Sequence, residues 1–137
     1  MFLLDTNVVS ELRRVRPHGA VVAWLSSVSK ASLRICAVTL GEIQRGIEMT
    51  RARDPAKARE IETWADSLEN SFAVIPADAA VFRFHARLMR GRPDSIYEDA
   101  MIAATALVHD LVVVTRDVAD FEGFGARIFD PFGFSPR

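Results

Sequence analysis

The stretch Leu111-Val112-Val113-Val114 is the part of the sequence that best indicates the fold class. Its four apolar residues do not alternate with polar ones. Such a run is typical of a strand in a parallel sheet that helices cover on both faces. Four further apolar runs predict short strands at 2–4, 33–38, 72–75 and 126–129.

Segments in which apolar residues recur at helical spacing separate these strands. They predict helices at 8–15, 20–28, 39–49 and 95–109. Asp54-Pro55 begins another helix that runs to about Asn70, and Asp78 caps one that ends near Gly91. Strands that alternate with helices predict an α/β fold, a three-layer α/β/α domain around a mostly parallel sheet of about five short strands. The 137 residues are the length of one domain, so we expect a single domain over 1–137.

Composition excludes several classes of protein. Half of the residues are hydrophobic and 26% are charged, which excludes a disordered tail, a coiled coil and a collagen-like chain. Seventeen basic and eighteen acidic residues give a net charge of −1, so no global positive field indicates a nucleic-acid partner. The single cysteine, Cys36, lies in an apolar run and is expected in the core. With neither a membrane-length apolar segment nor a signal peptide evident, we expect no membrane association and a cytoplasmic protein.

Four acidic residues are expected near the carboxyl edge of the sheet, where open α/β sheets bind ligands. Asp5 follows the first strand, and Asp117 follows the fourth after Thr115-Arg116. Glu42 lies one turn into the helix that follows the second strand, and Asp99 lies near the start of the helix at 95–109. Clustered carboxylates repel one another unless a cation lies among them, and an oxygen-only ligand set favours Mg²⁺ or Mn²⁺.

Each of these acids also has a structural interpretation. Asp5 can serve as a turn residue, and Asp117 can cap the short turn that follows it. Thr39-Leu40-Gly41-Glu42 and Ser95-Ile96-Tyr97-Glu98 both match the capping-box pattern, in which the glutamate binds the backbone amide of the cap. The second match gives its glutamate a structural role and leaves Asp99 without one.

Other kinds of site have weaker support. The three histidines have no zinc-ligand spacing with one another or with Cys36, and His85 is expected in the core. A haloacid-dehalogenase-like phosphatase needs a second acid at the position of Asn7. A receiver domain needs a lysine after a late strand, and neither Lys30 nor Lys57 lies there.

Four blocks in the sequence resemble the PIN-domain ribonucleases. They are the N-terminal Phe2-Leu3-Leu4-Asp5-Thr6-Asn7, then Glu42 after a strand, Asp99 leading into 100–106, and Thr115-Arg116-Asp117 with Asp120-Phe121. The resemblance covers essentially the whole chain. The spacing and total length are similar to those of the toxin in VapBC-type toxin–antitoxin pairs.

The resemblance implies metal-dependent hydrolysis of RNA phosphodiester bonds. The catalytic and metal-binding residues would be Asp5, Glu42, Asp99 and Asp117, with Mg²⁺ (or Mn²⁺) as the cofactor, bound as one ion or two. The supporting residues would be Thr6, Asn7, Thr115 and Asp120. Because the acids repel phosphate, arginines are candidates for phosphate contacts with an RNA whose identity stays open, and these are Arg13, Arg14, Arg45 and Arg116.

The resemblance also implies partners. We expect a homodimer that binds a cognate VapB-like antitoxin. The candidates for contact with it are Leu12, Val22, Trp24, Leu25 and Ile47, with core packing the favoured interpretation at Leu12 and Ile47. The alternative function is a catalytically silent PIN-like module that binds RNA or protein, and a nuclease assay with and without EDTA would separate the two.

Overall fold

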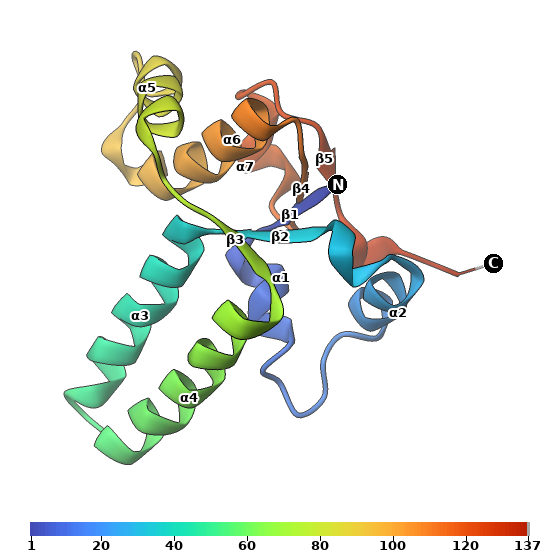
Figure 1. Cartoon of the computed structure of the whole chain (residues 1–137), viewed down its shortest axis with the longest axis vertical. Coiled ribbons are helices and arrows are strands. Elements are labelled where there is room, and N and C mark those ends of the chain that lie inside the picture. The colour runs from blue at the N-terminus through green and yellow to red at the C-terminus, as the bar shows by residue number, and fades with distance from the viewer. Residues whose placement is uncertain (137) are drawn as a thin grey trace.

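Every pair of neighbouring strands in the sheet is parallel. The computed structural model of the protein describes residues 1–136 and arranges five strands in the order β3-β2-β1-β4-β5 (Figure 1). The strands are β1 (Phe2–Leu4), β2 (Leu33–Cys36), β3 (Ala73–Ile75), β4 (Val112–Val114) and β5 (Ile128–Phe129). The predicted number of strands and their direction are confirmed.

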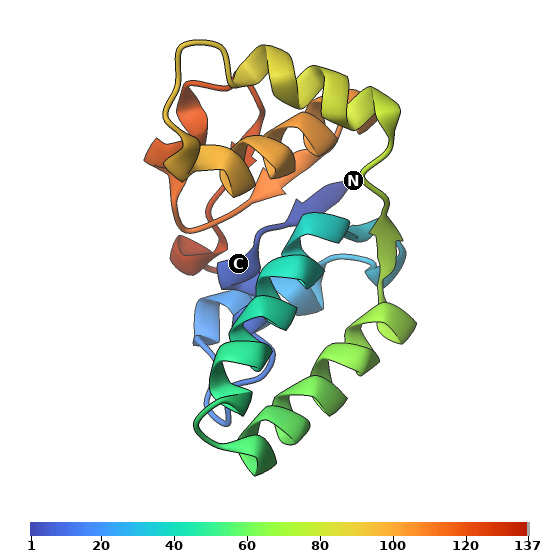
Figure 2. The same cartoon turned by 90° about the vertical axis from the view of Figure 1, so that its left-hand side faces the viewer.

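Successive residues of a strand point to opposite faces of the sheet, and here both faces are buried. Leu3 and Val113 pack in the cluster on the α6 and α7 side, whereas Leu4 and Val114 pack in the cluster formed with α1 to α4. The helices are α1 (Thr6–Glu11), α2 (Gly19–Ser27), α3 (Ala37–Arg51), α4 (Pro55–Ser71), α5 (Ala79–Leu88), α6 (Tyr97–His109) and α7 (Val118–Glu122). Figure 2 shows the two helical layers on either side of the sheet, which confirms the three-layer architecture.

Helices α3 and α4 form a hairpin that extends away from the sheet (Figures 1 and 2). The turn between them ends at Asp54, whose side chain accepts a hydrogen bond from the backbone N–H of Lys57 at 3.1 Å. Pro55 follows in the first turn of α4, where its missing N–H costs nothing. The start of α4 is therefore confirmed. Asp78 caps α5 in the same way, by accepting a hydrogen bond from Val81 N at 3.0 Å.

Helix α1 begins and ends earlier than the predicted range 8–15. Its N-cap is Asp5, and its last residue is Glu11. The buried residues of the helix include Val8 and Val9, whereas Val15 is 98% exposed and so has no packing to hold a further turn.

Neither predicted capping box forms. Helix α3 begins at Ala37, two residues before the predicted start, so Thr39 is buried inside the helix and does not cap it. Helix α6 begins at Tyr97 with Ile96 as its N-cap, and no side chain caps it. Glu42 and Glu98 are therefore free of the structural role that the pattern assigned to them.

The five residues predicted for antitoxin contact differ in their exposure. Trp24 and Ile47 are buried in the core at 4% and 0% exposure, so the prediction of a surface contact at Trp24 is wrong. Leu12 and Val22 are 36% and 42% exposed, so the favoured core interpretation of Leu12 is also wrong. Leu25 packs partly buried against the core.

None of the helices described is both long and apolar enough to cross a membrane.

Candidate active site at the carboxyl edge of the sheet

The chain builds the sheet outward from β1 to β3 and then returns to place β4 on the other side of β1. The carboxyl ends of β1 and β4 therefore form the topological switch point, where open α/β sheets bind ligands. Leu4 is in register with Val114, so the residues that follow them, Asp5 and Thr115, lie side by side. The hydroxyl of Thr115 donates a hydrogen bond to Oδ2 of Asp5 at 2.7 Å.

Asn7 connects the two chain segments at this point. Its Nδ2 lies 3.3 Å from Oδ2 of Asp5, 3.3 Å from Oγ1 of Thr115 and 3.0 Å from Oδ2 of Asp117. Its Oδ1 accepts a hydrogen bond from the backbone N–H of Arg116 at 3.3 Å. One amide side chain thus fixes the positions of two predicted metal ligands relative to each other.

Thr6 reaches the third acid. Its hydroxyl donates a hydrogen bond to Oε1 of Glu42 at 3.1 Å and lies 3.5 Å from Oγ1 of Thr39. Glu42 faces this edge because α3 follows β2 without a loop, which places its second turn beside the end of β1. The residue is part of the polar cluster rather than a helix cap.

The carboxylates act on one another electrostatically. Burial raises the pKa of Asp5, and the charges of Asp117 and Asp120 raise it further against the hydrogen bonds from Thr115 and Thr6. Burial, together with the charges of Asp5, Glu98 and Asp99, raises the pKa of Glu42 to about 7.

Asp99 joins the same cluster from the first turn of α6. Burial raises its pKa to about 6, with further contributions from the charges of Asp5, Asp120, Asp117 and Glu98. None of Asp5, Glu42 and Asp99 forms an ion pair with another residue in the described part of the chain. The anionic forms are thus costly, and a cation at this edge would offset the cost.

The donor set fits a hard divalent cation, because it consists of carboxylate oxygens, and the charge of Asp5 raises the pKa values of both Glu42 and Asp99. Among residues 1–136, however, no three acidic, histidine or cysteine side chains lie close enough together to form a ready-made metal site. The predicted quartet is therefore gathered at one edge without being in coordinating positions.

The four arginines predicted to contact phosphate lie in different surroundings. Arg14 pairs with Glu11 at 3.6 Å, and Arg45 lies 4.0 Å from Glu98. The guanidinium of Arg116 lies over the ring of Phe132, 4.0 Å from its centroid. Arg13 forms no side-chain hydrogen bond or ion pair within the described residues.

Glu98 is the residue of this edge that the sequence interpretation missed. It raises the pKa values of Glu42 and Asp99, which places its charge within the cluster. Its position directly before Asp99 on the first turn of a helix was the available signal.

His85 and Cys36 are buried as predicted. Nε2 of His85 lies 3.2 Å from the carbonyl oxygen of Tyr97, and Cys36 packs against Thr105.

Comparison with known proteins identifies the family. The family model for the PIN domain matches residues 2–124, which include every acid of the site. The chain belongs to the PIN-domain family. This confirms the resemblance on which the site was predicted.

Related PIN domains match the chain over nearly its full length. It is 34% identical to the VapC ribonuclease Y4jK of Sinorhizobium fredii, covering 96% of this chain and 98% of the relative. It is 32% identical to toxin FitB of Neisseria gonorrhoeae, covering 96% and 99%. A solved structure of FitAB bound to an IR36 DNA fragment contains a chain that superposes with a TM-score of 0.83 at 30% identity, covering 99% of both chains.

Proposed function

We infer that this chain is a ribonuclease that acts as the toxin of a type II, VapBC-like toxin–antitoxin pair. One observation carries this inference: Asp5, Glu42 and Asp99 come from separate segments of a PIN domain, burial raises the pKa of each, and the charge of Asp5 raises the pKa values of Glu42 and Asp99 further. The relatives named as a VapC ribonuclease and as a toxin support the same activity.

Asp5, Glu42, Asp99 and Asp117 would hold Mg²⁺ or Mn²⁺ in this proposal, with Asp120 contributing negative charge nearby. When bound, a divalent ion supplies Lewis-acid stabilisation of charge on the phosphate and activation of water. Asp117 is exposed and Asp99 is half-buried, and rotation of the two side chains would bring them toward Asp5, which is already held by Thr115.

The neighbouring polar groups orient the acids. The backbone N–H of Thr6 donates to Oδ1 of Asp5 at 2.7 Å while Thr115 donates to Oδ2, so both carboxylate oxygens are fixed. Asn7 holds Asp117, and the Thr6 hydroxyl holds Glu42. Such outer hydrogen bonds orient ligands, and their removal weakens metal binding or activity by about 10–100-fold in other metal sites.

Partners follow from the same inference. The FitAB structure holds a chain similar to this one together with DNA. We therefore propose a DNA-binding antitoxin as the cognate partner, RNA as the substrate, a homodimer as the toxin's own assembly and the cytoplasm as its location.

An RNA-cleavage assay tests the function. The isolated toxin should cleave RNA in Mg²⁺ or Mn²⁺, lose activity in EDTA and regain it when the metal is restored. Asp99→Asn should keep the circular dichroism spectrum and lose most of the cleavage activity, because a neutral amide is a poor replacement for an anionic oxygen ligand of a hard cation. Asp66→Asn, at an exposed acid of α4, is the matched control. RNA binding without cleavage would support the silent module, and cleavage that survives EDTA would contradict the metal site.

A further inference from the structure

A groove leads away from the acidic edge along the α3–α4 hairpin. It consists of two adjoining hollows that share Arg13, Ile61 and Trp64 in their linings. The inner hollow, about 280 Å³, begins at Thr6 and Glu42, and the outer one, about 390 Å³, ends at Lys57. We call this continuous surface the Trp64 groove.

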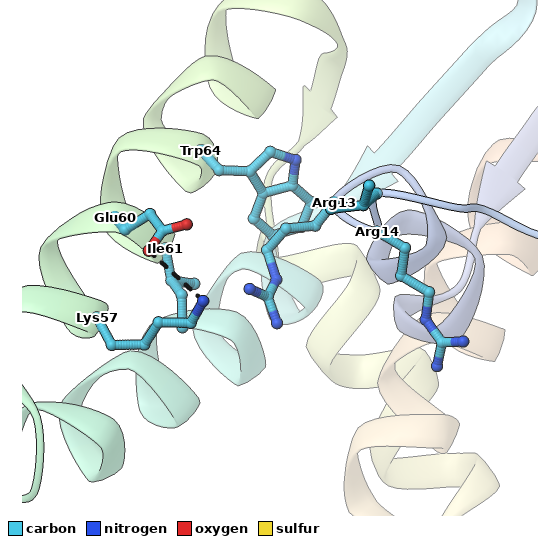
Figure 3. A pocket seen from close by; sticks show the side chains of 7 residues that line it. Arg13, Arg14, Lys57, Glu60, Ile61 and Trp64 are labelled. Atoms are coloured by element: carbon cyan, nitrogen blue, oxygen red, sulfur yellow. Dashed lines mark hydrogen bonds and ion pairs between the residues drawn. The ribbon is translucent and has the colours of Figure 1, made fainter.

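The outer end of the Trp64 groove is positively charged. Arg13, Arg14 and Lys57 line it, and Glu60 is its one acidic side chain among the described residues. Lys57 pairs with Glu60 at 3.5 Å, and because both side chains are exposed, this surface ion pair is weak and a phosphate can replace the carboxylate. Arg13, which has no such pair, extends toward the indole of Trp64 (Figure 3).

The wall of the groove is apolar and aromatic. Trp64 packs partly buried against the core, so its ring is held by its neighbours, and it lines both hollows. Figure 3 shows the indole bordering the space between α4 and the segment that follows α1. A fixed aromatic face beside surface cations is the arrangement that binds single-stranded nucleic acid, in which bases stack on the ring and phosphates contact the cations.

We propose that the Trp64 groove binds single-stranded RNA beside the cleavage site, with one base stacked on Trp64 and the adjoining phosphates on Arg13 and Lys57. This proposal rests on the ribonuclease function above. A base inside a duplex is stacked on both faces and cannot reach the indole, so the groove selects unpaired substrate.

Two observations favour RNA over a peptide as the occupant. The inner hollow opens on Thr6 and Glu42, so a strand lying in it is continuous with the proposed cleavage site. In addition, the acidic side chains of the edge repel phosphate, so cations close by that attract the same strand favour binding of a substrate there. Arg13 and Lys57 are cations on the same groove.

The first experiment measures binding without cleavage. A fluorescein-labelled 12-nucleotide RNA of unstructured sequence is titrated with the toxin in EDTA and followed by anisotropy. Trp64→Leu should raise Kd about 5- to 150-fold, the range that corresponds to one base stacked on an aromatic ring, while Trp64→Phe should retain most of the affinity. A blunt-ended RNA duplex, which has no unpaired bases, should bind wild type and Trp64→Leu alike.

The second experiment uses the cations, since Trp64→Leu could lower stability through its core contacts. Arg13→Ala should weaken binding and reduce the slope of log Kd against log salt concentration by about 0.7, the value for one phosphate contact with a single strand. Arg59→Ala is the matched control, because Arg59 is exposed on α4 about 200° around the helix from Lys57 and should leave the slope unchanged.

The outcomes separate the groove from the cleavage activity. Wild-type RNA binding that Trp64→Leu and Arg13→Ala do not change would overturn the Trp64 groove even if the toxin cleaves RNA. If Trp64→Leu and Arg13→Ala weaken binding of the antitoxin but leave RNA binding intact, the groove binds a peptide. That result would also overturn the RNA proposal. A toxin that binds RNA through Trp64 and Arg13 but never cleaves would support the groove and contradict the ribonuclease function.

Discussion

Glu42→Gln should make the metal-free protein more stable at pH 8 while removing most of its cleavage activity. The native fold raises the pKa of Glu42 from 4.5 to about 7, mainly through burial and then through neighbouring acids. A shift of one pKa unit corresponds to about 1.4 kcal/mol, so the ionised carboxylate costs at most about 3 kcal/mol. Because Glu42 is only half-buried, water screens part of that cost, and we expect about 1–2 kcal/mol.

The sign of the pH dependence follows from the raised pKa. The folded state binds the proton of Glu42 more tightly than the unfolded state does. The contribution of this proton to the free energy of unfolding is therefore fully present below about pH 4.5. That contribution is lost as the pH rises through about 7. Glutamine keeps an oxygen that can accept the hydrogen bond from Thr6, but it carries no charge to lose.

Urea denaturation in EDTA at pH 4.5, 6 and 8 measures the effect. Wild type should lose stability across this range more steeply than Glu42→Gln, and the variant should exceed wild type by about 1–2 kcal/mol at pH 8. Glu69→Gln is the control, because Glu69 is exposed on α4 and pairs with no residue that the structure describes. A variant less stable than wild type at pH 8, or a difference independent of pH, would refute this reasoning.

Three other expectations concern the metal, the neighbouring glutamate and the assembly. Millimolar Mn²⁺ should stabilise wild type by about 2–3 kcal/mol once its concentration reaches about 100 times Kd. Thermal melts should show a much smaller rise in melting temperature for Asp5→Asn. Equal rises in the two proteins would contradict the shared metal site. Glu98→Gln should keep RNA cleavage within about threefold of wild type, since Glu98 lies beside Arg45 rather than on Asp5; a loss matching that of Glu42→Gln would make Glu98 a ligand. Light scattering at micromolar concentration should give the mass of a dimer, and a monomer would refute the homodimer.

The sequence was sufficient to predict which segments meet at the carboxyl edge. Parallel strands bring their carboxyl ends to one edge, so the positions of Asp5 and Thr115 follow once 2–4 and 111–114 are identified as strands. The strand order was not predictable, because nothing local in a three-residue strand specifies its neighbour. The direct contact between Asp5 and Thr115 therefore came only from the register.

Local patterns failed where tertiary packing decided the outcome. A capping box needs its threonine at a helix end, but α3 continues directly from β2 and buries Thr39 against Thr6. The apolar residues of 20–28 could equally face a partner or the core. Trp24 faces the core because its ring packs against Phe2 and Phe129, at centroid distances of 5.1 and 5.3 Å.

The net charge of −1 excluded only a uniform field, and the structure explains why that is a weak constraint on function. The acids gather at the switch point, and Arg13 and Lys57 border the groove beside α4. At physiological ionic strength the Debye length is about 8 Å, so a phosphate responds to the charges nearest to it rather than to the sum over the chain. A nearly neutral protein can therefore repel phosphate at the edge where a cation would bind and attract it in the adjoining groove.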